Sequence, residues 1–185
     1  MQIIIHRVNT LEKLRRIPHD FGVEIDLRAY GSKIYLSHDP IDESSNYLSF
    51  EKFLKNYDNK TLVLNVKESG LEDRIISIVE EYGIQDYFLL DIEFPYIFDA
   101  VKNSKTRKIA LRFSEAEPIE MCTTMIHNDN TSVDWIWIDT NTILPINPNN
   151  VKILTKFKTC LVCPERWGRP HDIKKYKKKN ERNGF

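Results

Sequence analysis

Three short groups of side chains in the first 40 residues have the types and spacing to do chemistry. The central group is Glu24 and Asp26, which stand two residues apart within an apolar run. On a β-strand, side chains two residues apart share a face, so both carboxylates would point the same way. Mg²⁺ and Ca²⁺ prefer hard oxygen ligands. These two carboxylates are therefore candidate ligands of one divalent cation.

The other groups supply side chains for proton transfer and for anion binding. His6 and His38 carry imidazoles, which move protons near neutral pH. Arg7 offers a planar fork of donors and Lys67 a point charge, and both suit phosphate oxygens. Together these residue types are suited to a reaction at a phosphate group.

Plainer interpretations remain open for each group. Glu24 and Asp26 can be ordinary strand-end carboxylates, although two charges on a buried face are costly without a partner or a metal. His6 can be a hydrogen-bonded core histidine. His38 can belong to a turn, because the Asp-Pro pair that follows it favours one.

Length and composition limit the class of protein. The 185 residues, 41% of them hydrophobic, are enough for one domain with a substantial core. The formal net charge is zero, which disfavours a globally basic nucleic-acid binder. No apolar run reaches the roughly 18 residues of a transmembrane helix, and the N-terminus lacks the pattern of a signal peptide. Three cysteines, an odd number, suit a reducing compartment. We expect a cytoplasmic protein.

The charge is nevertheless unevenly distributed. Residues 166–185 hold eight basic and two acidic side chains, a local charge of +6, so the remainder carries −6. We expect a main domain over 1–170 and a basic tail or helix over 171–185. The run of lysines at 174–179 is a solvated helix face or a surface that touches nucleic acid or another polyanion. With a net charge of zero, we do not expect nucleic acid as a partner.

Strand and helix patterns alternate from end to end, which indicates an α/β domain with a parallel sheet. The expected helices are 50–56, 71–82, 94–102, 114–125 and a weaker one at 150–156. The expected strands are 2–6, 22–27, 33–37, 61–66, 87–91, 108–113, 135–139 and 159–163.

Seven of these strands end in a polar or charged residue, with 33–37 set apart as a side hairpin. In a (β/α) barrel such ends converge on one mouth, whereas an open sheet would spread them along a line. We therefore expect a small TIM-like barrel. Nothing after Glu165 has the pattern of an eighth strand, and typical barrels have about 250 residues, so either the barrel is incomplete or the chain is a shortened version of something longer. An unpaired sheet edge would favour a homodimer.

The later strand ends add candidate pocket residues, namely Asp91, Asn65, Arg112, Asp139 and Glu165. Arg112 and Glu165 can instead form a structural ion pair across the mouth, and Asp139 can cap the next helix. The inward-facing tryptophans at 135 and 137 would mainly fill the barrel. The cysteines at 160 and 163 sit in an apolar run, which favours core cysteines over a redox pair.

The order His6-Arg7, Glu24-x-Asp26 and His38-Asp39 resembles the glycerophosphodiester phosphodiesterase family, which belongs to the phosphatidylinositol-phospholipase-C-like phosphodiesterases. That family consists of TIM barrels that cleave phosphodiesters, usually with one divalent cation. The resemblance implies that His6 and His38 are the catalytic general base and acid. It also implies that Glu24 and Asp26 hold Mg²⁺ or Ca²⁺, and that the basic side chains at 7, 67 and 112 bind phosphate.

The chain departs from the family pattern at the third parallel strand. The family has Glu-x-Lys there, with the Glu as a third metal ligand, whereas this chain has Asn65 and Lys67. An amide oxygen can still ligate the cation, but the site loses one negative charge. Asp91 can substitute. The segment after Arg7 is also compressed, as in a small bacterial subgroup that shares the segments at 112–115, 135–139 and 164–165. These changes indicate an altered substrate pocket.

The sequence thus predicts a metal-dependent phosphodiester hydrolase acting on a small glycerophosphodiester-like substrate. A catalytically lapsed barrel that binds a phosphorylated metabolite is the first alternative, and the Asn at 65 favours it. An interaction protein that uses its basic tail is the second.

Overall fold

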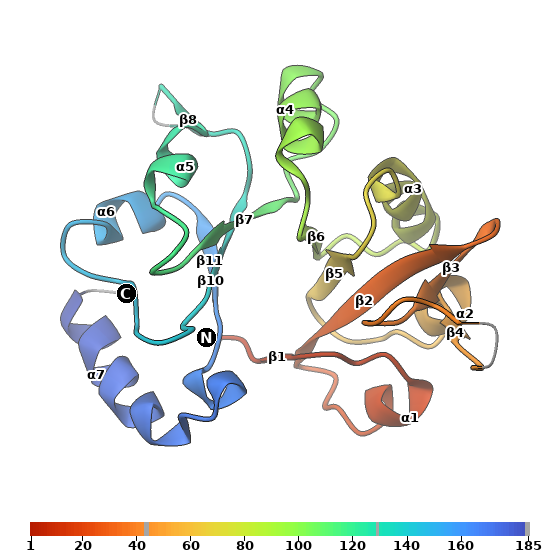
Figure 1. The fold of residues 1–185 in the computed structure, drawn as a ribbon. Helices are drawn as coiled ribbons and strands as arrows, with labels where there is room; N and C mark the ends of the chain where they lie inside the picture. The colour runs from red at the N-terminus through yellow and green to blue at the C-terminus, as the bar shows by residue number, and fades with distance from the viewer. Residues whose placement is uncertain (43–44, 129, 184–185) are drawn as a thin grey trace. The chain divides into compact units, whose positions relative to one another are not determined.

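The computed structural model of the chain describes residues 1–42, 45–128 and 130–183 (Figure 1). The chain divides into two compact units, Met1–Glu93 and Phe94–Phe185. Residues 184 and 185, the end of the predicted basic segment 171–185, lie outside the described residues.

The first unit is built around one mixed sheet with the strand order β4-β3-β2-β5-β6, with β1 also paired to β2. The pairs β1–β2, β2–β5 and β5–β6 are parallel, whereas β3 runs antiparallel to both β2 and β4. The strands are β1 Ile4–Ile5, β2 Gly22–Tyr30, β3 Lys33–Leu36, β4 Leu48–Ser49, β5 Leu62–Val66 and β6 Tyr87–Leu90.

Strand β2 is the centre of this sheet. One of its edges is paired along most of its length with β5. The other edge is shared, because β1 pairs with Gly22 and Val23 while β3 pairs with 27–30. Between them, Val8 N–H donates to the Glu24 carbonyl and Ser37 N–H to the Asp26 carbonyl. The segments after β1 and after β3 therefore both reach the middle of β2.

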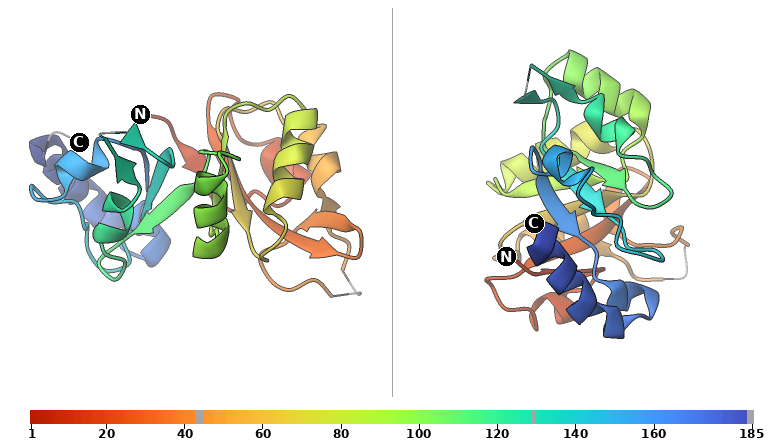
Figure 2. Two further views of the ribbon diagram at one scale, coloured as in Figure 1. Left: turned by 90° about the horizontal axis from the view of Figure 1, so that it is seen from above. Right: turned by 90° about the vertical axis from the view of Figure 1, so that its left-hand side faces the viewer.

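Three helices accompany this sheet: α1 Leu11–Leu14, α2 Phe50–Leu54 and α3 Glu72–Glu81. Ser49 caps α2 by accepting a hydrogen bond from the Lys52 N–H, and Thr10 caps α1 in the same way. Figures 1 and 2 show α2 and α3 beside the sheet. Their buried apolar side chains explain why they pack there, and these are Phe50, Phe53, Leu54, Ile75 and Val79.

The second unit contains a three-stranded parallel sheet, β11-β10-β7, and a two-stranded antiparallel pair, β8-β9. The strands are β7 Ala110–Phe113, β8 Ile126–His127, β9 Asn130–Thr131, β10 Trp135–Ile138 and β11 Lys158–Leu161. The helices are α4 Phe94–Lys102, α5 Glu120–Thr123, α6 Val151–Leu154, the short 3₁₀ segments η1 Pro164–Trp167 and η2 Pro170–Asp172, and α7 Ile173–Asn183.

These elements confirm a mixed α/β fold with parallel strands and the side hairpin at 33–37. Each of the seven expected parallel strands is present. Among the described residues the strand pairings form separate sheets and no closed barrel, so closure into one barrel stays a prediction.

Two local expectations are wrong. The helix expected at 114–125 shrinks to Glu120–Thr123, because the Ser114 side chain accepts the N–H groups of Ala116 and Glu117 in a turn just before Pro118. Cys163 is exposed rather than in the core, because β11 ends at Leu161. Within the described residues, no helix has the length and apolar character needed to cross a membrane.

We expect Gly22→Ala to destabilise the protein by about 1–3 kcal/mol, because a Cβ at this position would lie 2.6 Å from the Thr61 carbonyl oxygen. The substitution would push β2 away from β5, and urea denaturation measures the cost. Gly31→Ala is the control, since its Cβ would meet no atom and only its positive φ of 57° opposes alanine. Equal stability of wild type and Gly22→Ala would contradict this account of the close approach.

Candidate active site

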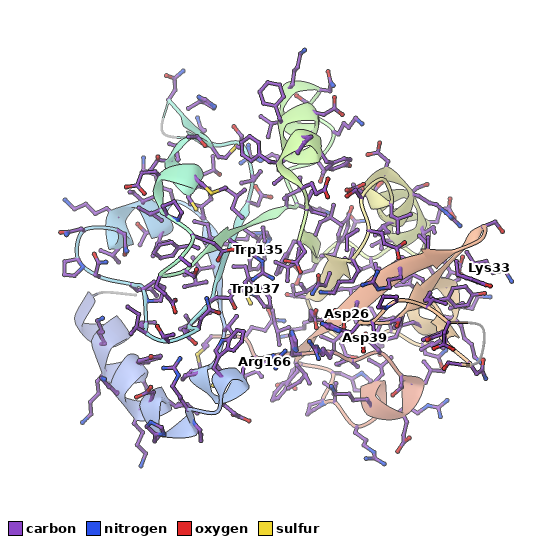
Figure 3. The ribbon with its side chains drawn as sticks, in the orientation of Figure 1. Asp26, Lys33, Asp39, Trp135, Trp137 and Arg166 are labelled. Atoms are coloured by element: carbon purple, nitrogen blue, oxygen red, sulfur yellow. The ribbon has the colours of Figure 1, made fainter. Side chains whose placement is uncertain are left out.

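The candidate site lies in the first unit, around Glu24 and Asp26 of β2, both of which are fully buried. The parallel register sets Asp26 beside Asn65 of β5, so the three side chains share one face as the sequence predicts. Asn65 donates from Nδ2 to Glu24 Oε1 at 2.8 Å. In Figure 3, Asp26 and Asp39 lie toward the same end of the β2–β3 hairpin, away from Lys33 at its turn.

Asn9 holds Asp26 from the loop after β1. Its Nδ2 donates to Asp26 Oδ2 at 2.8 Å, and its Oδ1 accepts the Asp26 N–H at 3.0 Å. One side chain thus fixes both the carboxylate and the backbone of Asp26. The sequence indicated that this loop is short but not the role of Asn9, because nothing in a single sequence pairs Asn9 with Asp26, 17 positions away.

Two buried oxygens on this face, Asp26 Oδ1 and Asn65 Oδ1, accept no hydrogen bond from any residue in the described part of the chain. The first lies 3.2 Å from Lys67 Nζ as an ion pair. Buried oxygens with spare lone pairs are what a hard divalent cation requires, so Glu24, Asp26 and Asn65 fit such an ion. The described residues contain no group of three or more His, Cys, Asp or Glu side chains arranged for a metal. The donor set is therefore two carboxylates and one amide.

Burial raises the pKa of Glu24 from 4.5 to about 7, and the neighbouring Asp26 carboxylate adds to the effect. Hydrogen bonds from the Arg7 N–H and from Asn65, and the charge of Lys67, oppose it. A proton or a cation at this position would relieve the repulsion between the two buried carboxylates.

The segment after β1 brings His6 and Arg7 to Glu24. His6 Nε2 lies 3.6 Å from Glu24 Oε2, and the Arg7 N–H donates to the same oxygen at 2.6 Å. Arg7 has a φ of 55°, in the left-handed region that non-glycine residues rarely adopt. Lys13 Nζ donates to the carbonyls of both His6 and Arg7 at 2.7 Å, which holds this turn in place. A strained backbone like that of Arg7 is typical of a functional site.

His38 joins this group through the Arg7 side chain. Arg7 Nη2 lies 2.6 Å from His38 Nε2, and His38 Nδ1 lies 2.8 Å from Asp39 Oδ1. A guanidinium only donates, so Nε2 is the acceptor and the His38 proton sits on Nδ1, toward Asp39. The hydrogen bond with His38 holds the pKa of Asp39 below its usual value.

Arg28 and Glu68, which the sequence did not indicate, fix the backbone of His38. Arg28 donates to the His38 carbonyl from Nε at 3.2 Å and from Nη2 at 3.1 Å. Its Nη1 also forms an ion pair with Glu68 at 3.0 Å, and Glu68 in turn accepts the Ala29 N–H. Because Glu68 directly follows Lys67, one charged pair ties the His38 loop to the end of β5.

Lys67 bridges two carboxylates, with Nζ 3.2 Å from Asp26 Oδ1 and 3.3 Å from Asp91 Oδ2. Asp91 was expected here because it would share a strand face with Leu89, but that reason is wrong. The register pairs Leu90, not Leu89, with Asn65, and Asp91 follows the strand with a left-handed φ of 61° that redirects its side chain.

The remaining predicted residues, Arg112, Asp139 and Glu165, belong to the second unit. Arg112 and Asp139 form an ion pair between the ends of β7 and β10. Glu165 lies exposed in η1, and the register sets Cys160 rather than Leu161 on the face of Trp137, so the expected face of β11 is wrong. The two labelled tryptophans of β10 are visible in Figure 3. A place for these three residues in the same pocket as Glu24 stays a prediction.

The sequence matches no protein-family model and no curated protein. Among solved structures, the fold is similar to that of a protein from Agrobacterium tumefaciens described as a "putative glycerophosphoryl diester phosphodiesterase". The TM-score is 0.62 with 13% sequence identity, and the match covers 86% of this chain and 83% of that one. The chain therefore shares the fold of that protein, in agreement with the resemblance of its N-terminal motifs.

The raised pKa of Glu24 predicts how the stability of the metal-free protein depends on pH. Between pH 4.5 and about 7 the folded state holds a proton on Glu24 that the unfolded state has lost, so stability falls as pH rises through this window. In EDTA, wild type should lose roughly 1–3 kcal/mol relative to Glu24→Gln between pH 5 and pH 8. Urea denaturation at several pH values measures the difference.

Glu12→Gln is the matched control, because Glu12 is an exposed carboxylate in an ion pair with Arg16. Its pH dependence should parallel that of wild type. A wild-type curve that also runs parallel to that of Glu24→Gln would show that the Glu24 pKa is not raised by burial.

Proposed function

We propose that this protein is a metal-dependent phosphodiester hydrolase that acts on a small glycerophosphodiester-like substrate in the cytoplasm. The observation that carries the proposal is the buried pair Glu24 and Asp26, where Asp26 Oδ1 and the Oδ1 of neighbouring Asn65 accept no hydrogen bond from the residues that the structure describes. Two histidines and two cationic side chains surround this pair within the same unit. The fold shared with the Agrobacterium protein supports the same reaction class.

Glu24, Asp26 and Asn65 would hold the cation, either Mg²⁺ or Ca²⁺. When bound, the cation would neutralise charge on a phosphate oxygen and make the phosphorus a better electrophile. Asn9 fixes the Asp26 carboxylate from behind, and such supporting contacts strengthen metal binding.

The two histidines have separate roles in the proposed reaction. A nucleophilic oxygen forms a bond to phosphorus while the bond to the leaving alcohol breaks, so one group must accept a proton and another must donate one. His6, beside Glu24, would accept the proton of the nucleophile. His38 would donate a proton to the leaving alkoxide.

Arg7 must move before His38 can donate a proton from Nε2, because the Arg7 guanidinium is hydrogen-bonded to that nitrogen at 2.6 Å. An anionic phosphate would attract the guanidinium and leave Nε2 free to take up a proton. Asp39 would stabilise the resulting imidazolium at Nδ1. Binding of the substrate would thus allow His38 to take up the proton that it then donates as the general acid.

We further propose that all seven parallel strands close into one barrel and that the protein forms a homodimer. The proposed pocket also includes Asp91, Arg112, Asp139 and Glu165. The ligand can also be a phosphorylated metabolite that is bound without turnover, an alternative favoured by the single amide in place of a third acidic ligand.

Hydrolysis of bis(p-nitrophenyl) phosphate and glycerophosphocholine tests the proposal. We expect turnover with Mg²⁺ or Ca²⁺, none with EDTA, and a loss of at least 100-fold in His6→Ala and His38→Ala, since general acid–base catalysis contributes about 10²–10⁴-fold. His19→Ala is the control, because His19 is exposed and pairs with Asp58. It should retain wild-type activity.

No turnover by folded wild type with either metal would overturn the hydrolase. If glycerophosphocholine still protects the protein against thermal unfolding, the binding protein is the better account. Turnover that survives in both histidine variants would instead contradict the roles given to His6 and His38.

A further inference from the structure

Helix α7 carries an unusually dense array of positive charge on its exposed side. Its lysines at 174, 175, 177, 178 and 179 are all exposed, and among the described side chains the first four form no ion pair. Lysines three or four positions apart repel each other along a helix. The helix therefore keeps a charge pattern that opposes its own stability, which is typical of a functional surface.

The opposite side of α7 is firmly attached to the second unit. Tyr176 is buried, and its hydroxyl lies 2.8 Å from Arg169 Nη1. Arg169 also forms an ion pair with Asp172 and donates to the carbonyls of Thr140 and Asn141. This attachment fixes which side of the helix faces outward, and α7 lies on the outside of the second unit in Figures 1 and 2.

Two large apolar side chains that come before the lysines in the sequence are also exposed. Trp167 of η1 is 42% exposed and Ile173, the first residue of α7, is 39% exposed. The guanidinium of Arg166 lies 5.6 Å from the centre of the Trp167 ring. Exposed tryptophan and aliphatic side chains next to lysines are the composition of helices that lie in the interface of a lipid bilayer.

We propose that α7, together with Arg166 and Trp167, is a docking surface for membranes that contain anionic phospholipids. Lysines near such a surface are attracted by its negative potential, and Trp167 and Ile173 would enter the headgroup region. Nucleic acid fits less well. Single-strand binders stack successive bases on several aromatic rings, whereas the described residues of this surface expose one such ring, Trp167, because Tyr176 of α7 is buried. This proposal does not depend on the proposed enzymatic activity.

Co-sedimentation of the full chain with vesicles tests this proposal, in EDTA and 50 mM salt. We expect binding to vesicles of phosphatidylcholine with 30% phosphatidylserine, none to phosphatidylcholine alone, and release in 500 mM salt. The combined change of Lys174, Lys175, Lys177 and Lys178 to Gln should weaken binding at least tenfold, since each lysine contributes about fivefold near an anionic surface.

The matched control changes four exposed lysines of the first unit to Gln, namely Lys33, Lys52, Lys55 and Lys60. It removes the same charge and should weaken binding less than threefold. Failure of wild type to bind anionic vesicles, or equal losses in the two variants, would overturn the proposal. So would a 30-nucleotide single-stranded DNA that binds through the α7 lysines more tightly than the vesicles do.

Discussion

Two carboxylates on the same face of one strand, both removed from water, set the main constraint on the first unit. Side by side and without compensation, the charges of Glu24 and Asp26 would oppose folding. Neighbouring hydrogen-bond donors and one cation compensate both charges. The Arg7 N–H and Asn65 donate to Glu24, Asn9 donates to Asp26, and Lys67 stands as the neighbouring cation. A divalent cation on the remaining oxygens would complete the compensation.

The sheet brings these partners together because two strands, β1 and β3, pair with different parts of the same edge of β2. The chain after β1 and the chain after β3 each end their pairing near the middle of β2, where the carboxylates lie. His6 and His38 therefore reach the same region from opposite ends of the strand. The Arg28–Glu68 pair then fixes the second loop to the end of β5. The histidines thus depend on strand topology, which local sequence does not encode.

What the sequence predicted follows from periodicity. Alternation within 22–27 correctly set Glu24 and Asp26 on one face, and the register of β2 with β5 confirms that Asn65, which the sequence had also indicated, lies on that face. The tertiary contacts were not predicted. Asn9 donates to Asp26 and Arg28 donates to the His38 carbonyl, and these contacts join distant segments that no sequence periodicity relates. Asp91 was included for a wrong reason, since a left-handed residue ends the alternation that was used to place it.

Calorimetric titration of Ca²⁺ and Mg²⁺ into the purified chain tests the central claim most directly, which is that the buried carboxylate pair holds a cation. The account predicts one cation per chain in wild type, at least tenfold weaker binding in Asp26→Asn, and unchanged binding in Asp58→Asn, where the carboxylate is exposed. A folded wild type that binds neither cation, or an Asp26→Asn variant that binds as tightly as wild type, would contradict it.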